Sequence, residues 1–547
     1  MDPPTFVWGA ALGLVNHYFF HKYEPTSANI PLLLLPVQPV ALLVLLGEPF
    51  SRLFYTYVVF LGSLSLSIVA YRLSPFHPLA RYPGPVITKV TKLWSTWKTA
   101  QGYKYLWHKE LHDKYGPYVR TGPDELSVID ATAVCQILNF GGLEKGRYYE
   151  SGRHKDTPPT IVSLSGEAHT ARRRVWNRAL TSACIREYEP LLVKCASQLI
   201  SCLRDRTHAT VDLVHWLDLF AYGSLFFSEC TELTTNRYDL MGDLAFGGGF
   251  EMLRDGRDVD GVGERIRGFT KVSYLAGQIP WILRMIYLFP RVAREIQQFN
   301  DFGQNLAIQR MKNGAADEGD FEKQKPTLKT SAADGIVAIV AASDTTTSAL
   351  SSTVWFLLSN PECYRRVQQE VDSVFTEGDD PFDVNKHPEL HFLSACINEA
   401  LRLHPPLPSN GPRQVHLGQP GRTIAGRFIP EGTSVYTPAY SLHRNPDYFS
   451  PHPDKFLPER WLPDSKFEKH DTSAFIPFSL GPANCVGQKF AKREMLMVLS
   501  ALFKTFDIRF ADGFDSEAWP MGMQDFFVVS RGPLLVNLTP RHHGILV

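Results

Sequence analysis

One cysteine stands in a glycine-bounded loop directly ahead of a helical pattern. The segment reads Phe478-Ser-Leu-Gly481-Pro-Ala-Asn-Cys485-Val-Gly487. Gly481 and Gly487 allow sharp turns and a close approach of the backbone to a flat ligand. The amphipathic run 488–506 predicts a helix whose N-terminus lies near Cys485, where the helix dipole favours an anionic sulfur. A lone cysteine is usually an inert buried thiol, but this arrangement favours a thiolate presented to a metal.

A second segment that could do chemistry is the apolar run 334–358, which predicts a long buried helix. Asp344 is an acidic residue inside this apolar run. Burying a carboxylate costs free energy unless a partner or a function compensates for it. The hydroxyl of the next residue, Thr345, can bond back to the carbonyl four residues earlier and open the helix ladder. We expect a local bulge that holds water, with Asp344 relaying protons and Thr345 fixing the water. Taken alone, such a triplet is more often a helix cap or a surface turn.

Opposite charges also occur three residues apart in Glu399-Ala-Leu-Arg402, just before Pro405. Such a pair is usually a surface bridge worth under about 1 kcal/mol. The apolar residues around it predict a buried helix instead, and a buried pair needs further partners. Arg460, in the run Pro453 to Trp461, is the expected third member.

Another helical stretch, 169–178, concentrates four arginines beside His169. A solvated basic face is the plain interpretation of such a run. Lys489, Lys492 and Arg493 add basic charge after the cysteine loop, and together these side chains could receive an acidic protein partner.

Composition excludes several classes of protein. The 547 residues carry 56 basic and 56 acidic side chains, so nothing indicates binding to nucleic acid. Length alone would allow two to four domains. The eight cysteines form no close pairs, which disfavours a disulfide framework or a zinc site and fits a reducing compartment.

The N-terminal 72 residues differ from the rest because they contain three uncharged apolar runs, 5–20, 30–47 and 53–71. The third run has 19 residues, close to the roughly 20 that cross a bilayer. One to three spans are therefore expected. A cleaved signal peptide is disfavoured, because no basic region precedes the first run. Basic residues after the third run predict a cytosolic catalytic part, joined by a stiff proline-rich linker over 74–85.

Beyond the linker, the pattern predicts a mainly α protein with small β-sheets. Alternation over 118–121 and 125–129 indicates two strands around a turn at Gly122. Short strands are also expected at 422–425 and 433–437. The charged run 312–329 is expected to be a solvated loop, and the aromatic-rich region 213–302 is either a substrate-access lid or ordinary core.

These segments together resemble the cytochrome P-450 family over roughly residues 74–547. The cysteine loop is similar to the family's haem-binding loop, Phe-x-x-Gly-x-Arg-x-Cys-x-Gly, and its ending resembles fungal members. Ala483 stands where the family usually has arginine. The Asp344 segment is similar to the family's oxygen-activating signature, with Ala342 in place of the usual glycine. Glu399, Arg402 and Arg460 match its Glu-x-x-Arg and Pro-Glu-Arg elements.

The resemblance implies a cytochrome P-450 fold behind an N-terminal transmembrane anchor: anchor 1–72, hinge 73–90 and catalytic domain 91–547. It implies haem b with Cys485 as the axial ligand of the iron, and Glu399, Arg402 and Arg460 as a structural triad behind it. Two further sets of residues are implied as haem-binding: Phe478, Gly481 and Gly487 in the loop, and His169, Arg173 and Arg413 as partners of the propionates. His169 and Arg173 are expected to compensate for Ala483.

The resemblance further implies a haem-thiolate monooxygenase of the endoplasmic reticulum membrane. It would take electrons from an NADPH-dependent reductase, with cytochrome b5 as a second candidate donor, and oxidise a hydrophobic secondary metabolite with dioxygen. The rival interpretations are a haem-thiolate isomerase or dehydratase that needs no reductase, and a non-catalytic haem sensor or membrane scaffold. Terpenoid, alkaloid, polyketide and fatty acyl substrates stay open. The expected pocket walls are Val337, Ala338 and Ala341, then 406–409 and 523–527.

Overall fold

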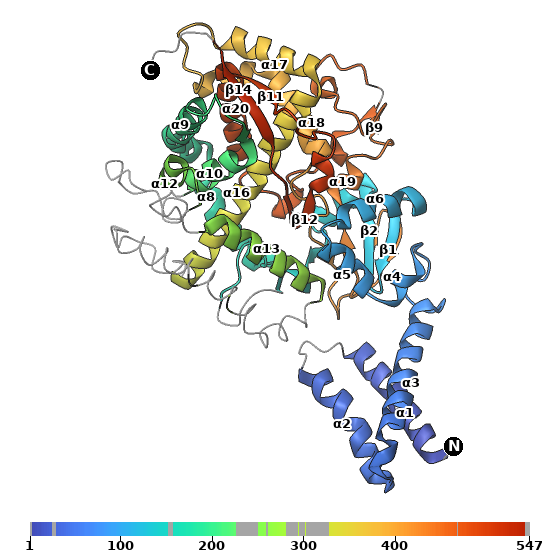
Figure 1. The fold of residues 1–547 in the computed structure, drawn as a ribbon. Coiled ribbons are helices and arrows are strands. Elements are labelled where there is room, and N and C mark those ends of the chain that lie inside the picture. The colour runs from blue at the N-terminus through green and yellow to red at the C-terminus, as the bar shows by residue number, and fades with distance from the viewer. Residues whose placement is uncertain are drawn as a thin grey trace.

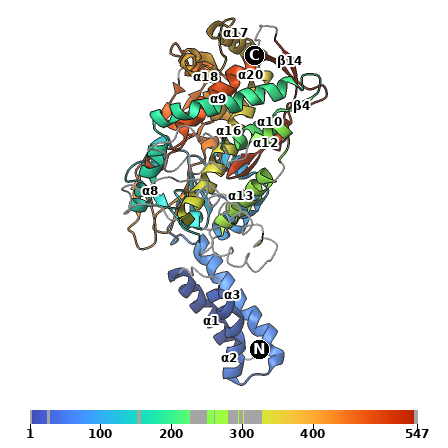
Figure 2. The same cartoon turned by 90° about the vertical axis from the view of Figure 1, so that its left-hand side faces the viewer.

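A stalk of three helices carries a larger, mainly helical part in the computed structural model (Figure 1), and the same division is visible from the side (Figure 2). The structure describes residues 3–23, 29–150, 157–225, 250–258, 261–279, 294, 301, 328–467 and 469–541. Helices form because long stretches repeat apolar residues at helical spacing, whereas the strands are short.

The stalk consists of α1 (Pro3–Lys22), α2 (Asn29–Leu46) and α3 (Leu53–Leu73). Helix α1 packs along α3 so closely that a Cβ on Gly13 would lie 2.0 Å from Ser63 Oγ. Within the described residues, the stretch 50–73 is the helix long and apolar enough to cross a membrane, and α2 contributes a shorter apolar stretch, 33–46. One candidate span is therefore present, as expected for the third apolar run.

The proline-rich hinge that follows α3 is packed against the catalytic part. The Arg120 amide, in strand β1 (Tyr118–Gly122), donates to Pro83 O at 2.7 Å, and Tyr82 Oη donates to Phe428 O at 2.9 Å. Gly84 lies so close to Arg120 that a Cβ would meet its carbonyl oxygen at 2.3 Å. Contacts with β1 and with Phe428 therefore hold the linker against the larger part of the protein.

Fourteen described helices build the catalytic part, with α16 running through its middle (Figure 1). They are α4 (Val86–Val90), α5 (Leu93–Ala100), α6 (Lys104–Tyr115), α7 (Ala131–Leu138), α8 (Gly166–Ala179), α9 (Ser182–Arg204), α10 (Leu213–Leu225), α12 (Phe250–Asp255), α13 (Val262–Gln278), α16 (Leu328–Ser359), α17 (Pro361–Val374), α18 (His391–Leu403), α19 (Ala439–Leu442) and α20 (Gln488–Thr505). The main apolar core lies where α9, α10, α17, α18 and α20 pack around α16.

Small sheets flank these helices. The largest has the order β1 (Tyr118–Gly122), β2 (Glu125–Val128), β8 (Ser434–Tyr436), β5 (Arg413–Gln414) and β3 (Glu144–Lys145). A second has the order β11 (Phe506–Phe510), β14 (Leu535–Pro540) and β4 (Val211–Asp212). Three antiparallel pairs complete the set: β6 (Arg422–Ile424) with β7 (Arg427–Ile429), β9 (Phe449–Ser450) with β10 (Lys469–His470), and β12 (Gln524–Phe526) with β13 (Val528–Ser530).

Most predicted elements are confirmed, with two corrections on the central helix. The expected loop 312–329 ends early, because α16 already begins at Leu328, and positions 312–327 lie outside the described residues. The bulge expected at Asp344 and Thr345 was wrong, since α16 is α-helical throughout. Much of the aromatic region 213–302 also lies outside the described residues, although Trp216 is core and Tyr274 faces the cavity described below.

Candidate active site

The loop that carries Cys485 is closed on itself and packed on α7. The Cys485 amide donates to Phe478 O at 2.8 Å. Gly481 has a φ of +69°, and a Cβ there would lie 2.3 Å from Leu138 O at the end of α7. Glycine is therefore required at 481 by loop conformation and protein packing, rather than by approach to a ligand. Helix α20 begins at Gln488, three positions after the cysteine, as predicted.

Cys485 opens into a cavity of about 650 Å³, which lies within the roughly 300–1,000 Å³ typical of small-molecule and cofactor sites. The cysteine lies deep in the protein, yet its side chain is exposed because it faces this space. Burial raises the pKa of the Cys485 thiol, whereas the Gly487 amide and the Arg173 guanidinium oppose that rise. A Cβ on Gly487 would meet only the sulfur, at 3.9 Å, so the space beside it is open.

Helix α16 forms the opposite wall with small side chains and one hydroxyl. Ala341, Ala342 and Thr345 line the cavity. Thr345 Oγ1 donates back to Ala341 O at 2.6 Å, which is the expected bond to the carbonyl four residues earlier. The helix accommodates this bond without breaking its ladder, and the hydroxyl remains at the cavity face.

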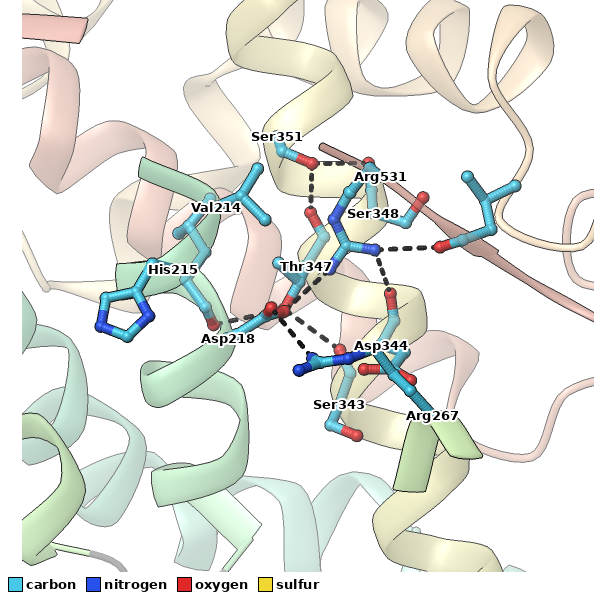
Figure 3. Close-up of polar contacts among 12 residues, drawn as sticks. Val214, His215, Asp218, Arg267, Ser343, Asp344, Thr347, Ser348, Ser351 and Arg531 are labelled. Atoms are coloured by element: carbon cyan, nitrogen blue, oxygen red, sulfur yellow. Dashed lines mark hydrogen bonds and ion pairs between the residues drawn. The ribbon is translucent and has the colours of Figure 1, made fainter. Parts of the chain in front are cut away.

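Asp344 is buried, but it is not among the residues that line the cavity. Figure 3 shows it beside Asp218, Arg267 and Arg531. It lies where α16 meets α10 and the C-terminal segment after β13. Arg531 Nη1 donates to the main-chain oxygen of Asp344 at 3.2 Å, and Arg531 Nη2 pairs with Asp218 at 2.9 Å. Arg267, which is about half exposed, pairs with Asp218 at 3.7 Å. Asp344 and Thr345 therefore face different sides of the same helix.

Basic side chains gather around the cavity: Lys145, His169, Arg173 and Arg413 all line it. Burial, with the neighbouring Lys145, Arg173 and Arg413, lowers the pKa of His169 to about 4. This low pKa favours the neutral, hydrogen-bonding form of His169 at pH 7, and the role of His169 and Arg173 in compensating for Ala483 stays a prediction. Sequence reasoning missed Lys145, whose pKa is lowered to about 7 by burial and by Arg413 and Arg173. Nothing in its local sequence signals this position.

Arg173 bridges the cation cluster to the cysteine loop. Its Nη2 donates to Asn484 Oδ1 at 2.7 Å, and its Nη1 donates to the main-chain oxygen of Asn484, between Ala483 and Cys485. Arg413 Nε is buried and has no hydrogen-bond acceptor within the described residues. An unsatisfied buried guanidinium nitrogen at a cavity wall fits an anionic group of a bound ligand. The donor set therefore fits the carboxylates of a haem.

Glu399, Arg402 and Arg460 meet with their side chains fully shielded from solvent. Arg402 Nε and Nη2 both donate to the Glu399 carboxylate at 2.8 Å, while Arg460 Nε lies 3.4 Å from Glu399 Oε1. Trp461 Nε1 and the Leu457 amide also donate hydrogen bonds to the Glu399 carboxylate, at 2.9 and 3.0 Å. These hydrogen bonds compensate for the removal of the charged groups from water, which a stable buried ion pair requires.

One histidine connects this triad to the cysteine loop, and the sequence did not reveal it. His443 Nδ1 donates to Arg402 O at 3.1 Å, and its Nε2 accepts from the Ile476 amide at 2.9 Å. Ile476 lies two positions before Phe478. Burial and the Arg402 charge lower the pKa of His443 to about 3, so the ring stays neutral and keeps one donor and one acceptor.

Asp334 is a second residue that sequence reasoning left without a role. It is almost fully buried near the start of α16, where Arg172 pairs with it and Trp176 Nε1 donates to it at 3.3 Å. The Ile161 amide also donates to it at 3.4 Å. An isolated carboxylate in an apolar run was the available signal. Asp334 thus ties α8 and the segment before it to the central helix.

The structure differs in part from the predicted cavity walls and from the predicted basic face. Val337, Ala338, Ala341, Pro406, Leu407 and Phe527 line the cavity. Met523 belongs to the main core instead, and the buried Asp525 accepts from Tyr274 Oη at 3.3 Å. On the outer side of α20, Arg493 bonds to Glu189 and Lys492 Nζ lies 5.9 Å from the Phe478 ring, while Lys489 is exposed.

Comparison with known proteins agrees with this geometry. A family model described as cytochrome P-450 matches residues 91–534. The chain is 32% identical to the cytochrome P-450 monooxygenase cpaH of Aspergillus oryzae, covering 89% of this chain and 94% of the relative. It is 30% identical to averantin hydroxylase of Dothistroma septosporum (89% and 92% covered) and 32% identical to trichothecene C-15 hydroxylase of Fusarium sporotrichioides (87% and 95%). The chain therefore belongs to the cytochrome P-450 family.

Proposed function

We propose that this protein is a membrane-anchored haem-thiolate monooxygenase that hydroxylates a hydrophobic small molecule of secondary metabolism. The observation that carries the proposal is one cavity that has the Cys485 sulfur on one wall and the Thr345 hydroxyl on another. The named functions of the relatives, hydroxylation of averantin and of a trichothecene, support the reaction class and the kind of pathway.

Cys485 would hold the iron, and the cations across the cavity would hold the haem carboxylates. Bound haem with a thiolate ligand supplies the iron chemistry that activates dioxygen. Arg413 offers its unsatisfied Nε, Lys145 offers a cation whose pKa an anion would raise again, and neutral His169 offers a hydrogen bond. Arg173 acts mainly through the cysteine loop, because it binds Asn484.

Protons would reach the cavity along α16. The Thr345 hydroxyl lies at the cavity face and can hold a water molecule there. Asp344, on the other side of the helix, lies beside Arg531, Asp218 and the half-exposed Arg267, from where protons can be exchanged with solvent. We assign Asp344 to proton supply and Thr345 to water positioning on this basis.

The rest of the cavity selects an apolar substrate. Its walls carry Val337, Ala338, Leu407, Phe269 and Phe527. Such walls exclude water and bind by apolar contact, while few polar groups are left to orient the ligand. Apolar substrates partition into membranes, which is consistent with the apolar helix α3.

The electron donor would be an NADPH-dependent cytochrome P-450 reductase, with cytochrome b5 as a second donor. We place the protein in the endoplasmic reticulum membrane with its catalytic part in the cytosol, because basic residues follow α3. A haem-thiolate isomerase or dehydratase is the main rival, and the Asp344 and Thr345 pair argues against it. A haem sensor or scaffold would need no such pair.

Spectroscopy and turnover test the proposal. The reduced, carbon monoxide-treated protein is expected to give the red-shifted Soret band of thiolate ligation, and Cys485→Ser should abolish it. A substrate panel of terpenoids, alkaloids, polyketides and fatty acids should contain a compound that shifts the spin state and is hydroxylated only with reductase, NADPH and dioxygen. Rearrangement without reductase would support the isomerase, and no turnover with any compound would favour the sensor.

A further inference from the structure

A second cavity, of about 460 Å³, lies where the stalk joins the catalytic part. It is distant in sequence from the active-site loop and is lined by the end of α3, the hinge, α4 and β1. Four of its residues are cations: Arg72, Arg81, Lys89 and Arg120. Figure 1 places α3, α4 and β1 together at this junction.

The positive charge in this cavity is only partly offset by the described residues. None of the four cations forms an ion pair with a carboxylate there. Arg120 is fully buried and donates to main-chain oxygens of Arg72 and Pro123, which are neutral acceptors, while its Nη2 lies 3.2 Å from His77 Nε2. Arg72 donates to Val90 O at 2.7 Å, and Arg81 donates to Phe428 O. Asp124 is a carboxylate near this group: its charge opposes the lowering of the Arg72 and Arg120 pKa values, and it lies 3.8 Å from His77 Nε2.

This group of cations favours binding of an anion. Burial, reinforced by Arg72, lowers the pKa of Arg120 to about 10, and burial and Arg120 lower the pKa of Lys89. Arg120 is buried and Arg72 and Lys89 are partly buried, and cations held close together in such surroundings are costly unless an anion joins them. Four cations around one cavity suit a multiply charged phosphate group, which arginine binds with paired hydrogen bonds.

The position of the cavity indicates where that phosphate comes from. The 19 apolar residues before Arg72 span about 28 Å as a helix, close to the roughly 30 Å of a hydrocarbon core. Arg72 would therefore lie at the level of lipid headgroups. Neighbouring α4, α5 and the hinge expose large apolar side chains, as interfacial segments do: Phe76, Val86, Ile87, Leu93, Trp94 and Trp97.

We propose that the cavity lined by Arg72, Arg81, Lys89 and Arg120 binds the headgroup of an anionic phospholipid, of the phosphorylated phosphatidylinositol class. The inference goes beyond the monooxygenase reaction and rests on α3 spanning the membrane. Arg72 and Arg120 join the last turn of α3 to β1, so a bound headgroup holds the stalk and the catalytic part in one orientation on the membrane.

The test measures binding of dioctanoyl phosphatidylinositol 4-phosphate to the full-length protein in non-ionic detergent micelles by thermophoresis. Dioctanoyl phosphatidylcholine and free inositol 1,4-bisphosphate are the comparison ligands. We expect the Arg81→Gln, Lys89→Gln double variant to bind the anionic lipid about 30-fold more weakly. Arg204→Gln with Arg365→Gln is the matched control, because both residues are exposed and lie on α9 and α17, far from the stalk (Figure 1).

Equal affinity for phosphatidylcholine, or unchanged binding by the double variant, would overturn the proposal. Binding of inositol 1,4-bisphosphate as tight as that of the lipid would assign the cavity to a soluble phosphate and also overturn it. Alkaline carbonate extraction checks the anchor separately: release of the protein from membranes would disprove the placement of α3. The carbon monoxide spectrum of the double variant should equal that of wild type, so failure here leaves the proposed reaction intact.

Discussion

The guanidinium of Arg173 on α8 holds both oxygens of Asn484, the residue directly before Cys485. In the family resemblance an arginine is expected at position 483, within the loop itself. Here Ala483 stands in that place, and Arg173 reaches the same loop from outside. The loop conformation that aims the sulfur into the cavity therefore depends on a residue more than 300 positions away in the chain.

Replacing Arg173 is expected to weaken haem retention. Arg173→Met removes the two charge-assisted hydrogen bonds to Asn484, each worth about 1.5–3 kcal/mol, as well as the bond to Asn177, and frees the loop around Cys485. We expect lower haem content per protein and a carbon monoxide band moved from the thiolate toward the thiol position. Arg174→Met, on the exposed side of the same helix, is the control and should keep the wild-type spectrum. Equal spectra and haem content for both variants would contradict the assignment.

Glu399→Gln should destabilise the protein strongly. The substitution keeps the shape but leaves Arg402 and Arg460 buried with reduced compensation, a loss of about 3–5 kcal/mol. The matched control is Glu362→Gln, which removes an exposed pair with Arg365 at the same spacing of three residues and should cost under about 1 kcal/mol. Urea unfolding followed by haem absorbance measures both. A loss below 1 kcal/mol for Glu399→Gln would argue against a structural triad.

Thr345→Ala should uncouple oxygen use from product formation. The variant loses the hydroxyl that holds water at the cavity face, so product formation per NADPH should fall about 10²-fold and hydrogen peroxide release should rise. Thr353→Ala removes a similar bond to a carbonyl four residues earlier, at 2.7 Å, but lies outside the cavity wall. That control should remain coupled. Product yield and peroxide are measured together, and unchanged coupling in Thr345→Ala would remove its proposed role.

A buried lysine should make stability depend on pH. Lys104 is fully buried, with its Nζ 3.1 Å from Gln278 Oε1 and 3.8 Å from the Tyr436 ring centre. Burial lowers its pKa from 10.5 to about 8 in the folded protein. Between pH 8 and pH 10.5, Lys104 binds more protons in the unfolded chain than in the folded protein. The contribution of Lys104 to the free energy of unfolding therefore increases as the pH rises through this range.

Lys104→Met should remove that contribution. At pH 7 the melting temperature of the variant should exceed that of wild type by the largest margin. That difference in melting temperature should shrink as the pH rises to 9.5. The comparison is made on the haem-loaded proteins, with Lys109→Met as a partly exposed control on the same helix, where Lys109 pairs with Asp113. A difference between Lys104→Met and wild type that does not change with pH would contradict the shifted pKa.

Local sequence was enough to identify the family and the reaction class. The spacing around Cys485 and the hydroxyl after Asp344 identified the loop and the central helix, and the family, fold class and reaction class are confirmed. The bulge in α16 was wrong, because the Thr345 bond to Ala341 O fits within a continuous helix. The roles assigned to individual site residues stay predictions.

The sequence by itself determined which side chains form local patterns: the cysteine loop, the charged pair at Glu399 and Arg402, and an apolar run long enough for a membrane. These signals are readable because they depend on neighbours within one loop or one helix. Only the tertiary structure decided that Asp344 and Thr345 face different sides, that Lys145 joins the cation cluster, and that His443 connects Arg402 to the loop. Those relationships arise where distant segments pack together, and burial there changes the pKa and the available partners of each group.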